Sequence, residues 1–341
     1  MSDAAPAEAI AVLGAGSWGT ALAIQFARSG RPTLLWGRAE DDPSGMQLAR
    51  ENARYLPGAK FPPSLRAEPD LPRVFEEAPL VVVAVPSHAF RAVLTLMKPM
   101  MRPQTRLAWA TKGFELDTGK LPHQVAREVL GPDTSMAVLS GPTFAREVGM
   151  GLPTAMTVAS NDEAYAWRIA ENLSGDTFRA YTSTDIIGVE VGGAVKNVLA
   201  IGAGICDGLG FGANTRVALI TRGLVEMTRL GVALGAQAAT FMGLAGMGDL
   251  VLTCTDNQSR NRRMGLALAA GKTVKEAEAE IKQVVEGVLA AEAVHRVAAR
   301  AEVEMPICEQ IYRILYQGAE PQAAVVALMK RELKSEFAPG G

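Results

Sequence analysis

A glycine-rich turn between a buried strand and a helix constrains this chain more than any other feature. The apolar run at 10–13 leads into Gly14-Ala15-Gly16-Ser17-Trp18-Gly19, with glycines at the first, third and sixth positions of G-x-G-x-x-G. In such a turn Gly14 permits the tight bend, Gly16 admits a phosphate close to the backbone, and Gly19 lets the helix pack on the strand. The helix start then faces the anion with free N–H groups. The pattern predicts a dinucleotide pyrophosphate site, with a purely structural turn as the alternative.

The end of the next predicted strand, 32–36, bears on the choice of dinucleotide. A carboxylate at this point usually accepts hydrogen bonds from the ribose 2′-hydroxyl of NAD. Here the strand runs into Gly37-Arg38, and acidic residues follow at 40–42. Arg38 supplies a cation for a 2′-phosphate, which favours NADP(H) over NAD(H). The alternative is a solvated loop arginine.

Size and charge restrict the class of protein. The chain has 341 residues, of which 48% are hydrophobic, and a formal net charge of −2. This length predicts two domains with real cores, and the charge indicates no general attraction to nucleic acid or anionic membranes. The acidic start lacks the parts of a secretory signal, so we expect a cytoplasmic protein. The apolar region 186–213 is interrupted by charged residues, so it predicts a core helix and no integral membrane association.

Cysteine and histidine give no pattern of a metal site or a disulfide framework. Cys206, Cys254 and Cys308 are scattered and odd in number. They fit buried reduced thiols. The three histidines show no ligand spacing, so we expect no metal.

Apolar strands alternate with helical patterns through the first half of the chain. Further strands are predicted at 80–85, 107–111, 136–139 and 155–159. This alternation predicts an α/β domain over 1–185, a Rossmann-type, doubly wound and mostly parallel sheet. Ligands bind beyond the carboxyl ends of such strands, where Ser87, His88 and Lys112 fall. For Ser87 and His88, ordinary turn chemistry is the favoured interpretation.

The second half is helical in pattern, which predicts an all-α domain over 186–341. Amphipathic helices are expected at 217–234, 260–270, 274–303 and 307–316. Three glycines between 188 and 193 weaken a helix, so something must approach its backbone closely. Lys196 lies near that contact. Burial or a neighbouring cation such as Lys112 lowers the pKa of a lysine toward neutrality, where it exchanges protons; the alternative is a lysine that extends to solvent.

Two polar segments suit a phosphate monoester. The glycine-rich stretch 243–250 delivers the carboxylate of Asp249, and 255–263 reads as a helix start. Asn257 or Ser259 can cap that start, while Arg260 adds a forked donor. A capped helix with solvated arginines is the alternative for either segment alone.

Seven motifs in order along nearly the whole chain resemble the NAD-dependent glycerol-3-phosphate dehydrogenase family. They are G-A-G-S-W-G at 14–19, T-K-G at 111–113, S-G-P-T-F-A at 140–145, G-G-A-V-K-N at 192–197, G-M-G-D at 246–249, C-T-D-N-Q-S-R-N-R-R at 254–263 and V-V-E-G at 284–287.

The resemblance implies a role for each matched residue. Catalytic roles fall on Lys196 as proton donor and acceptor, with Lys112 and Asp249. Substrate contacts fall on Lys112, Gly141, Thr143, Lys196, Asp249, Ser259, Arg260 and Asn261. Cofactor contacts fall on Ser17, Trp18, Arg38, Tyr55, Lys112, Ala145, Arg260, Val284 and Glu286, beside the three glycines of the turn. A homodimer is the family expectation.

The activity that the resemblance implies is reversible reduction of dihydroxyacetone phosphate by NAD(P)H to sn-glycerol 3-phosphate, supplying glycerophospholipid synthesis. One alternative is a reductase of a carboxylate substrate, such as a 3-hydroxyacid dehydrogenase. It would also use a helix-borne lysine, but it gives no purpose to S-R-N-R or to the T-K-G lysine. A nicotinamide-binding sensor without turnover would need the glycine turn but neither lysine.

Overall fold

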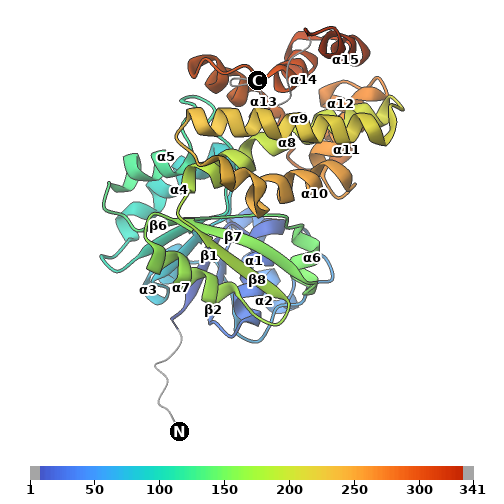
Figure 1. Cartoon of the computed structure of the whole chain (residues 1–341). Helices are drawn as coiled ribbons and strands as arrows, with labels where there is room; N and C mark the ends of the chain where they lie inside the picture. Colours follow the sequence, from blue (N-terminus) through green and yellow to red (C-terminus); the bar gives the residue numbers. More distant parts are fainter. Residues whose placement is uncertain (1–7, 333–341) are drawn as a thin grey trace. The chain divides into compact units, whose positions relative to one another are not determined.

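The computed structural model describes residues 8–332, and these form two compact units (Figure 1). The first contains the described residues through Lys112 together with Pro122–Ile186. The second contains Gly113–Leu121 and the described residues from Ile187 onward. The segment 113–121, which a boundary at 185 leaves in the first domain, thus belongs to the second unit. Its Phe114 and Leu121 are buried in the hydrophobic core of that unit.

The first unit is built on an eight-stranded sheet with the order β3-β2-β1-β4-β5-β6-β7-β8. All neighbours pair in parallel except β6 and β7, which are antiparallel. This confirms the doubly wound, mostly parallel sheet. The strands are β1 (Ile10–Leu13), β2 (Thr33–Trp36), β3 (Leu65–Glu68), β4 (Leu80–Val83), β5 (Arg106–Trp109), β6 (Met136–Ser140), β7 (Thr154–Ser160) and β8 (Phe178–Ser183).

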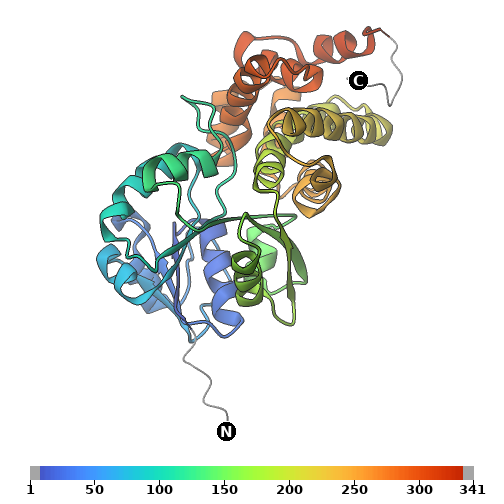
Figure 2. The same cartoon turned by 60° about the vertical axis from the view of Figure 1, so that its left-hand side comes forward.

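Helices cover both faces of this sheet. The strand order reverses between β1 and β4, so right-handed crossovers place α1 and α4 on opposite faces. Figure 2 shows α1 in blue on one side of the strands, with α4 and α5 on the other. The α-helices of the first unit are α1 (Ser17–Arg28), α2 (Pro43–Ala49), α3 (Leu71–Glu77), α4 (Ser87–Met97), α5 (Pro122–Leu130), α6 (Ala145–Met150) and α7 (Glu163–Leu173).

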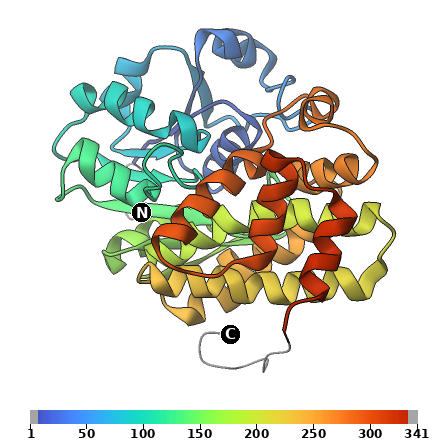
Figure 3. The same cartoon turned by 90° about the horizontal axis from the view of Figure 1, so that it is seen from above.

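The second unit is helical around one long central helix, α8 (Ile186–Gly208). This helix is long and apolar enough to cross a membrane, yet 94% of its most apolar window is buried inside the protein. It is therefore the core helix that the sequence predicts. Figure 3 shows α8 and α9 running side by side. The remaining helices are α9 (Gly212–Ala233), α10 (Asp249–Thr255), α11 (Arg260–Ala269), α12 (Val274–Ile281), α13 (Glu286–Arg300), α14 (Pro306–Gln317) and α15 (Pro321–Met329).

One predicted helix is wrong. The segment 274–303 is two helices, because Lys282 adopts a left-handed conformation with φ of 58° and ends α12. A residue without glycine's freedom takes this conformation at a cost, and the apolar pattern on either side does not reveal it. The break matters because it places 283–285 in a loop immediately before α13.

Candidate cofactor and substrate sites

The predicted phosphate turn has the geometry that its glycines imply. Gly14 has φ of 117°, and a Cβ there would lie 2.5 Å from the carbonyl oxygen of Ala84. A Cβ on Gly19 would lie 1.9 Å from the oxygen of Gly14, so both positions exclude a side chain. At Gly16, by contrast, a Cβ would meet no described atom within 4 Å. The backbone is thus open on one side, at the position where a phosphate would approach.

The start of α1 adds donors to this opening. The first backbone N–H groups of a helix have no intrahelical acceptor, and Gly16 has no side chain to cap them. The buried indole Nε1 of Trp18 also lacks a hydrogen-bond partner among the described residues. The hydroxyl of Ser17 donates to the carbonyl oxygen of Tyr55 at 2.7 Å, which ties the loop 50–60 to the turn. These features fit a dinucleotide pyrophosphate.

Arg38 follows β2 directly beside this turn. The backbone N–H of Gly14 donates to the oxygen of Trp36 at 2.9 Å, and a Cβ on Gly37 would lie 2.7 Å from that of Ala15. The Arg38 guanidinium is 67% exposed and lies 3.4 Å from Asp41 through Nε. This hydrogen bond raises the pKa of Arg38 above its ordinary value.

Other predicted residues of the first unit also follow its strands. Lys112 comes after β5, Gly141 and Thr143 come after β6, and Ala145 is the first residue of α6. Because β5 and β6 are parallel neighbours, these segments leave the same edge of the sheet as the glycine turn. Ser87 and His88 lie in the first turn of α4.

Lys196 and Asp249 form a buried ion pair in the second unit. Lys196 Nζ lies 2.5 Å from Asp249 Oδ1 and donates to Thr253 Oγ1 at 3.0 Å. Lys196 is 7% exposed and Asp249 1%. An adjacent carboxylate favours the charged ammonium form. Lys196 therefore does not extend to solvent, which removes that alternative.

The glycines of α8 explain how Asp249 reaches the lysine. A Cβ on Gly192 would lie 2.4 Å from the carbonyl oxygen of Ala245, so only glycine admits the backbone of the π-helical turn Leu244–Gly248. Asp249 begins α10 immediately after this turn. The predicted close approach to α8 is therefore the segment that carries the carboxylate.

The start of α11 is capped as the sequence predicts. Ser259 is the N-cap, and its side chain accepts from the backbone N–H of Arg262. Arg260 donates through a guanidinium nitrogen to the oxygen of Val284 at 2.9 Å, across from α11 to the loop before α13. Val284 lies in the loop that follows the break after α12.

An amide pair joins α11 to α8 and α13. Asn261 Nδ2 donates to Asn197 Oδ1 at 2.9 Å, and Asn261 Oδ1 accepts from the N–H of Gly287 at 2.9 Å. Glu286, the residue before Gly287, is the first residue of α13. The structure thus brings the motifs at 192–197, 254–263 and 284–287 together within one unit.

Two residues that contact the predicted site residues, Thr253 and Asn197, were not predicted from the sequence. Thr253 bonds Lys196 and lies four residues after Asp249 on the same helix, a spacing that places both on one face. Asn197 stands next to Lys196 within a motif, but an asparagine in an apolar helix carries no signal of its partner. Among the described residues no group of three or more His, Cys, Asp or Glu side chains could hold a metal ion. All three cysteines are free and buried.

Sequence comparisons cover both units. The model for the N-terminus of NAD-dependent glycerol-3-phosphate dehydrogenase matches residues 9–166, and the model for its C-terminus matches 185–326. The glycerol-3-phosphate dehydrogenase [NAD(P)+] of Aeromonas salmonicida is 58% identical over 96% of this chain and 98% of its own. That of Methylococcus capsulatus is 56% identical over the same shares.

A structural comparison agrees. The crystal structure of glycerol-3-phosphate dehydrogenase from Coxiella burnetii superposes with a TM-score of 0.92 at 49% identity, covering 95% of this chain and 99% of that one. The chain therefore belongs to the NAD-dependent glycerol-3-phosphate dehydrogenase family.

Proposed function

We propose that this chain catalyses the reversible NAD(P)H-dependent reduction of dihydroxyacetone phosphate to sn-glycerol 3-phosphate, with Lys196 as the general acid and base. The observation that carries the assignment of Lys196 is its buried contact with Asp249 and Thr253. A bound nicotinamide would supply the hydride for reduction of the C2 carbonyl carbon. The Lys196 ammonium would donate a proton to the carbonyl oxygen, on which negative charge develops during the reduction.

Asp249 holds the lysine in its charged form for this step. A buried ammonium without a counter-ion would lose its proton to solvent, since burial disfavours the charged form. The carboxylate at 2.5 Å compensates for that cost. In the reverse direction, the neutral amine of Lys196 accepts the proton from the C2 hydroxyl, and the ammonium again pairs with Asp249. We assign Lys112 to the same substrate oxygen or to substrate orientation.

The start of α11 is proposed to hold the substrate phosphate. Arg260 supplies a charged donor, and the N–H groups of the first turn favour an anion. Asn261 uses one amide hydrogen on Asn197 and has a second with which to donate. Gly141 and Thr143 are proposed as further substrate contacts.

The proposed cofactor contacts follow the same reasoning. Gly14, Gly16 and Gly19 would admit the pyrophosphate, with Ser17 and Trp18 beside it, and Arg38 would face the adenosine ribose and its 2′-phosphate. Tyr55, Lys112, Ala145, Arg260, Val284 and Glu286 complete the set that the family resemblance implies.

One assay tests the reaction. The purified chain is mixed with NADPH and either dihydroxyacetone phosphate, hydroxypyruvate or no substrate, and NADPH oxidation is followed by absorbance. We expect turnover only with dihydroxyacetone phosphate. Turnover of hydroxypyruvate alone would favour a carboxylate reductase. Binding of NADPH without turnover of either would favour a sensor.

The cellular role is part of the same proposal. We propose that the chain acts in the cytoplasm as a homodimer, without nucleic-acid partners or integral membrane association, and supplies sn-glycerol 3-phosphate to glycerophospholipid synthesis. Family resemblance supports the dimer and the supply role. Light scattering after size exclusion measures the oligomer. Growth of a strain that lacks its own enzyme, without added glycerol, tests the supply role.

A further inference from the structure

The residue after β2 that would read the cofactor ribose is already paired with acidic side chains of its own loop. Arg38 makes three contacts with them. Its backbone N–H donates to Asp41 Oδ2 at 3.0 Å, its Nε lies 3.4 Å from the same oxygen, and its Nε lies 3.8 Å from Glu40 Oε2. The two carboxylates differ in setting, because the Asp41 side chain is 10% exposed and that of Glu40 is 72% exposed.

Asp41 is fixed in its place beside the phosphate turn. It accepts from the backbone of Arg38 at the start of a short 3₁₀ turn, Ala39–Asp41. A Cβ on Gly37 would lie 3.2 Å from the Asp41 Cβ and 2.7 Å from that of Ala15. The carboxylate therefore packs against the strand end that itself contacts the glycine turn. Glu40 has no comparable support.

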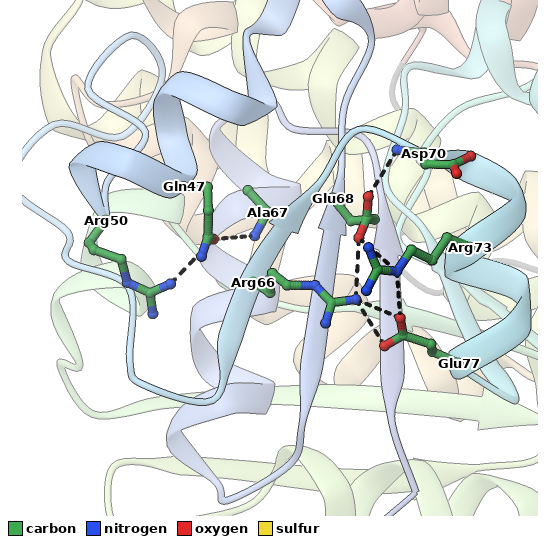
Figure 4. A network of polar contacts seen from close by, with 8 residues as sticks. All are labelled: Gln47, Arg50, Arg66, Ala67, Glu68, Asp70, Arg73 and Glu77. Carbon is green, nitrogen blue, oxygen red and sulfur yellow. Dashed lines mark hydrogen bonds and ion pairs between the residues drawn. The ribbon is translucent and has the colours of Figure 1, made fainter.

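The neighbouring acidic residue Glu68 is engaged elsewhere. It pairs in register with Trp36 at the end of β3, so it lies close to the same edge of the sheet. Figure 4 shows its carboxylate accepting from the backbone of Asp70 and paired with Arg66 and Arg73, which also pair with Glu77. This network leaves Asp41, whose side chain is 10% exposed, as the partly buried carboxylate in contact with Arg38.

We propose that Asp41 sets the cofactor selectivity of this enzyme by holding the Arg38 guanidinium, so that a 2′-phosphate must displace a resident carboxylate before it can bind. This inference rests on the proposed dinucleotide site. Binding of the NADPH phosphate would form a contact with Arg38, but it would break the Arg38–Asp41 contact and bring the phosphate near a carboxylate that repels it. Binding of NADH would break no such contact, and the ribose 2′-hydroxyl can donate to a carboxylate. Asp41 thereby reduces the preference for NADPH over NADH binding that Arg38 creates.

The size of the effect follows from its exposure. An exposed ion pair contributes little, and a fixed charge several ångströms from a phosphate in water costs a similar small amount. Removal of the charge should therefore strengthen binding of the 2′-phosphate by roughly three- to tenfold. The gain should shrink as salt is raised, since the charges are close to solvent.

Equilibrium binding of two nucleotide fragments tests the proposal without catalysis. Titration calorimetry compares adenosine 2′,5′-bisphosphate with 5′-AMP, which differ only in the 2′-phosphate. Asp41→Asn keeps an acceptor for the Arg38 backbone and removes the charge. Asp41→Ser, which also removes the charge and carries a hydroxyl oxygen that can accept, repeats the test if asparagine disturbs the turn. Glu40→Gln is the matched control, with the same change in charge on the exposed neighbour.

We expect Asp41→Asn to tighten the bisphosphate by that factor, to leave 5′-AMP unchanged, and to lose the gain when Arg38→Ala is added. Glu40→Gln should have less effect. An equal gain in bisphosphate affinity in Asp41→Asn and Glu40→Gln would show that only the net charge of the loop matters, and it would overturn the inference. Unchanged bisphosphate affinity in both Asp41 variants would overturn it as well. A parent protein that binds neither fragment would instead contradict the dinucleotide site itself, and the inference would fall with it.

Discussion

At the scale of single residues, the proposed proton transfer depends on the buried pair of Lys196 and Asp249. A lysine and an aspartate on separate helices, both almost fully buried and in contact, carry a desolvation cost that structural packing does not require. A replacement by apolar residues of similar volume would often be neutral for folding. The retention of the charges is thus consistent with a use in proton transfer.

Lys196→Met tests that use directly. Methionine has a similar length but no ammonium group to transfer a proton, so kcat should fall by roughly two to four orders of magnitude. NADPH affinity, measured by fluorescence titration, should change little. Lys275→Met, on an exposed position of α12, is the control and should keep parent turnover. A folded Lys196→Met enzyme within threefold of parent kcat would remove Lys196 from the mechanism.

Arg260 is a second single-residue test, because its proposed partner is the substrate phosphate and its observed partner is the oxygen of Val284. Arg260→Ala should lower kcat/KM for dihydroxyacetone phosphate by about two orders of magnitude, since a charged contact in a desolvated site is worth a few kcal/mol. The kcat/KM for unphosphorylated dihydroxyacetone should hardly change in Arg260→Ala. Arg263→Ala, exposed on the same helix, is the matched control.

The contact of Arg260 with Val284 defines the opposite outcome. If both substrates lose the same factor at saturating NADPH, Arg260 acts by positioning the 283–285 loop or the cofactor. The assignment of the phosphate to α11 would then be wrong.

At the scale of elements, features that depend on local residue chemistry could be predicted from the sequence, and features that depend on tertiary contacts could not. The glycine turn, the Ser259 cap and the close approach to α8 each follow from residues that few other conformations accommodate. The edge strands β3 and β8 were not predicted. Both are short or half-exposed, so their side chains lack the continuous apolar run of a central strand. The antiparallel pairing of β7 also leaves no mark in its composition.

The fit of α8 against the π-helical turn gives a prediction for one element. Gly192→Ala places a methyl group 2.4 Å from a backbone oxygen, so the Ala245–Asp249 segment must move away from Lys196. We expect kcat to fall by at least about tenfold, since a displacement near 1 Å can cost about 10²-fold in rate.

Gly202→Ala is the matched control on the same helix. Its new methyl group would meet the Ile311 side chain at 2.8 Å and that of Leu219 at 3.3 Å, and flexible side chains can shift. It should reduce thermal stability without a comparable loss of kcat. Equal kcat in the two variants would show that Gly192 is not needed to place Asp249 for catalysis.

At the scale of the whole molecule, the division of the chain could be predicted only in part. The change from alternating strands to helices marks residue 186 closely, because it is a change of period. The return of 113–121 to the second unit could not be seen, since it depends on where Phe114 and Leu121 find a core. The bond from Arg300 to the oxygen of Thr118 at 2.7 Å then holds the segment there.

The stability of the protein should depend on pH through Glu226 of α9. This carboxyl is 3% exposed and accepts from the backbone N–H groups of Ile307 at 2.7 Å and Cys308 at 3.2 Å, at the start of α14. Burial raises its pKa to about 7, against the lowering effect of those N–H groups. The folded protein therefore binds this proton more tightly than the unfolded chain, whose glutamate has its ordinary pKa near 4.5.

The sign of the effect follows from linkage. Because the folded state binds more protons between the two pKa values, the free energy of unfolding rises as pH falls through 7, and the gain is complete below about 4.5. The full gain is on the order of 3 kcal/mol, since each pKa unit corresponds to about 1.4 kcal/mol. Urea unfolding at several pH values between 5 and 8 measures it, with Glu226→Gln and the exposed Glu278→Gln compared with the parent. The slope should flatten in Glu226→Gln, whatever its absolute stability, and persist in Glu278→Gln. Parallel curves for the parent and Glu226→Gln would show that Glu226 does not couple folding to pH, and the two N–H groups of α14 would then hold a carboxylate that stays charged throughout this range.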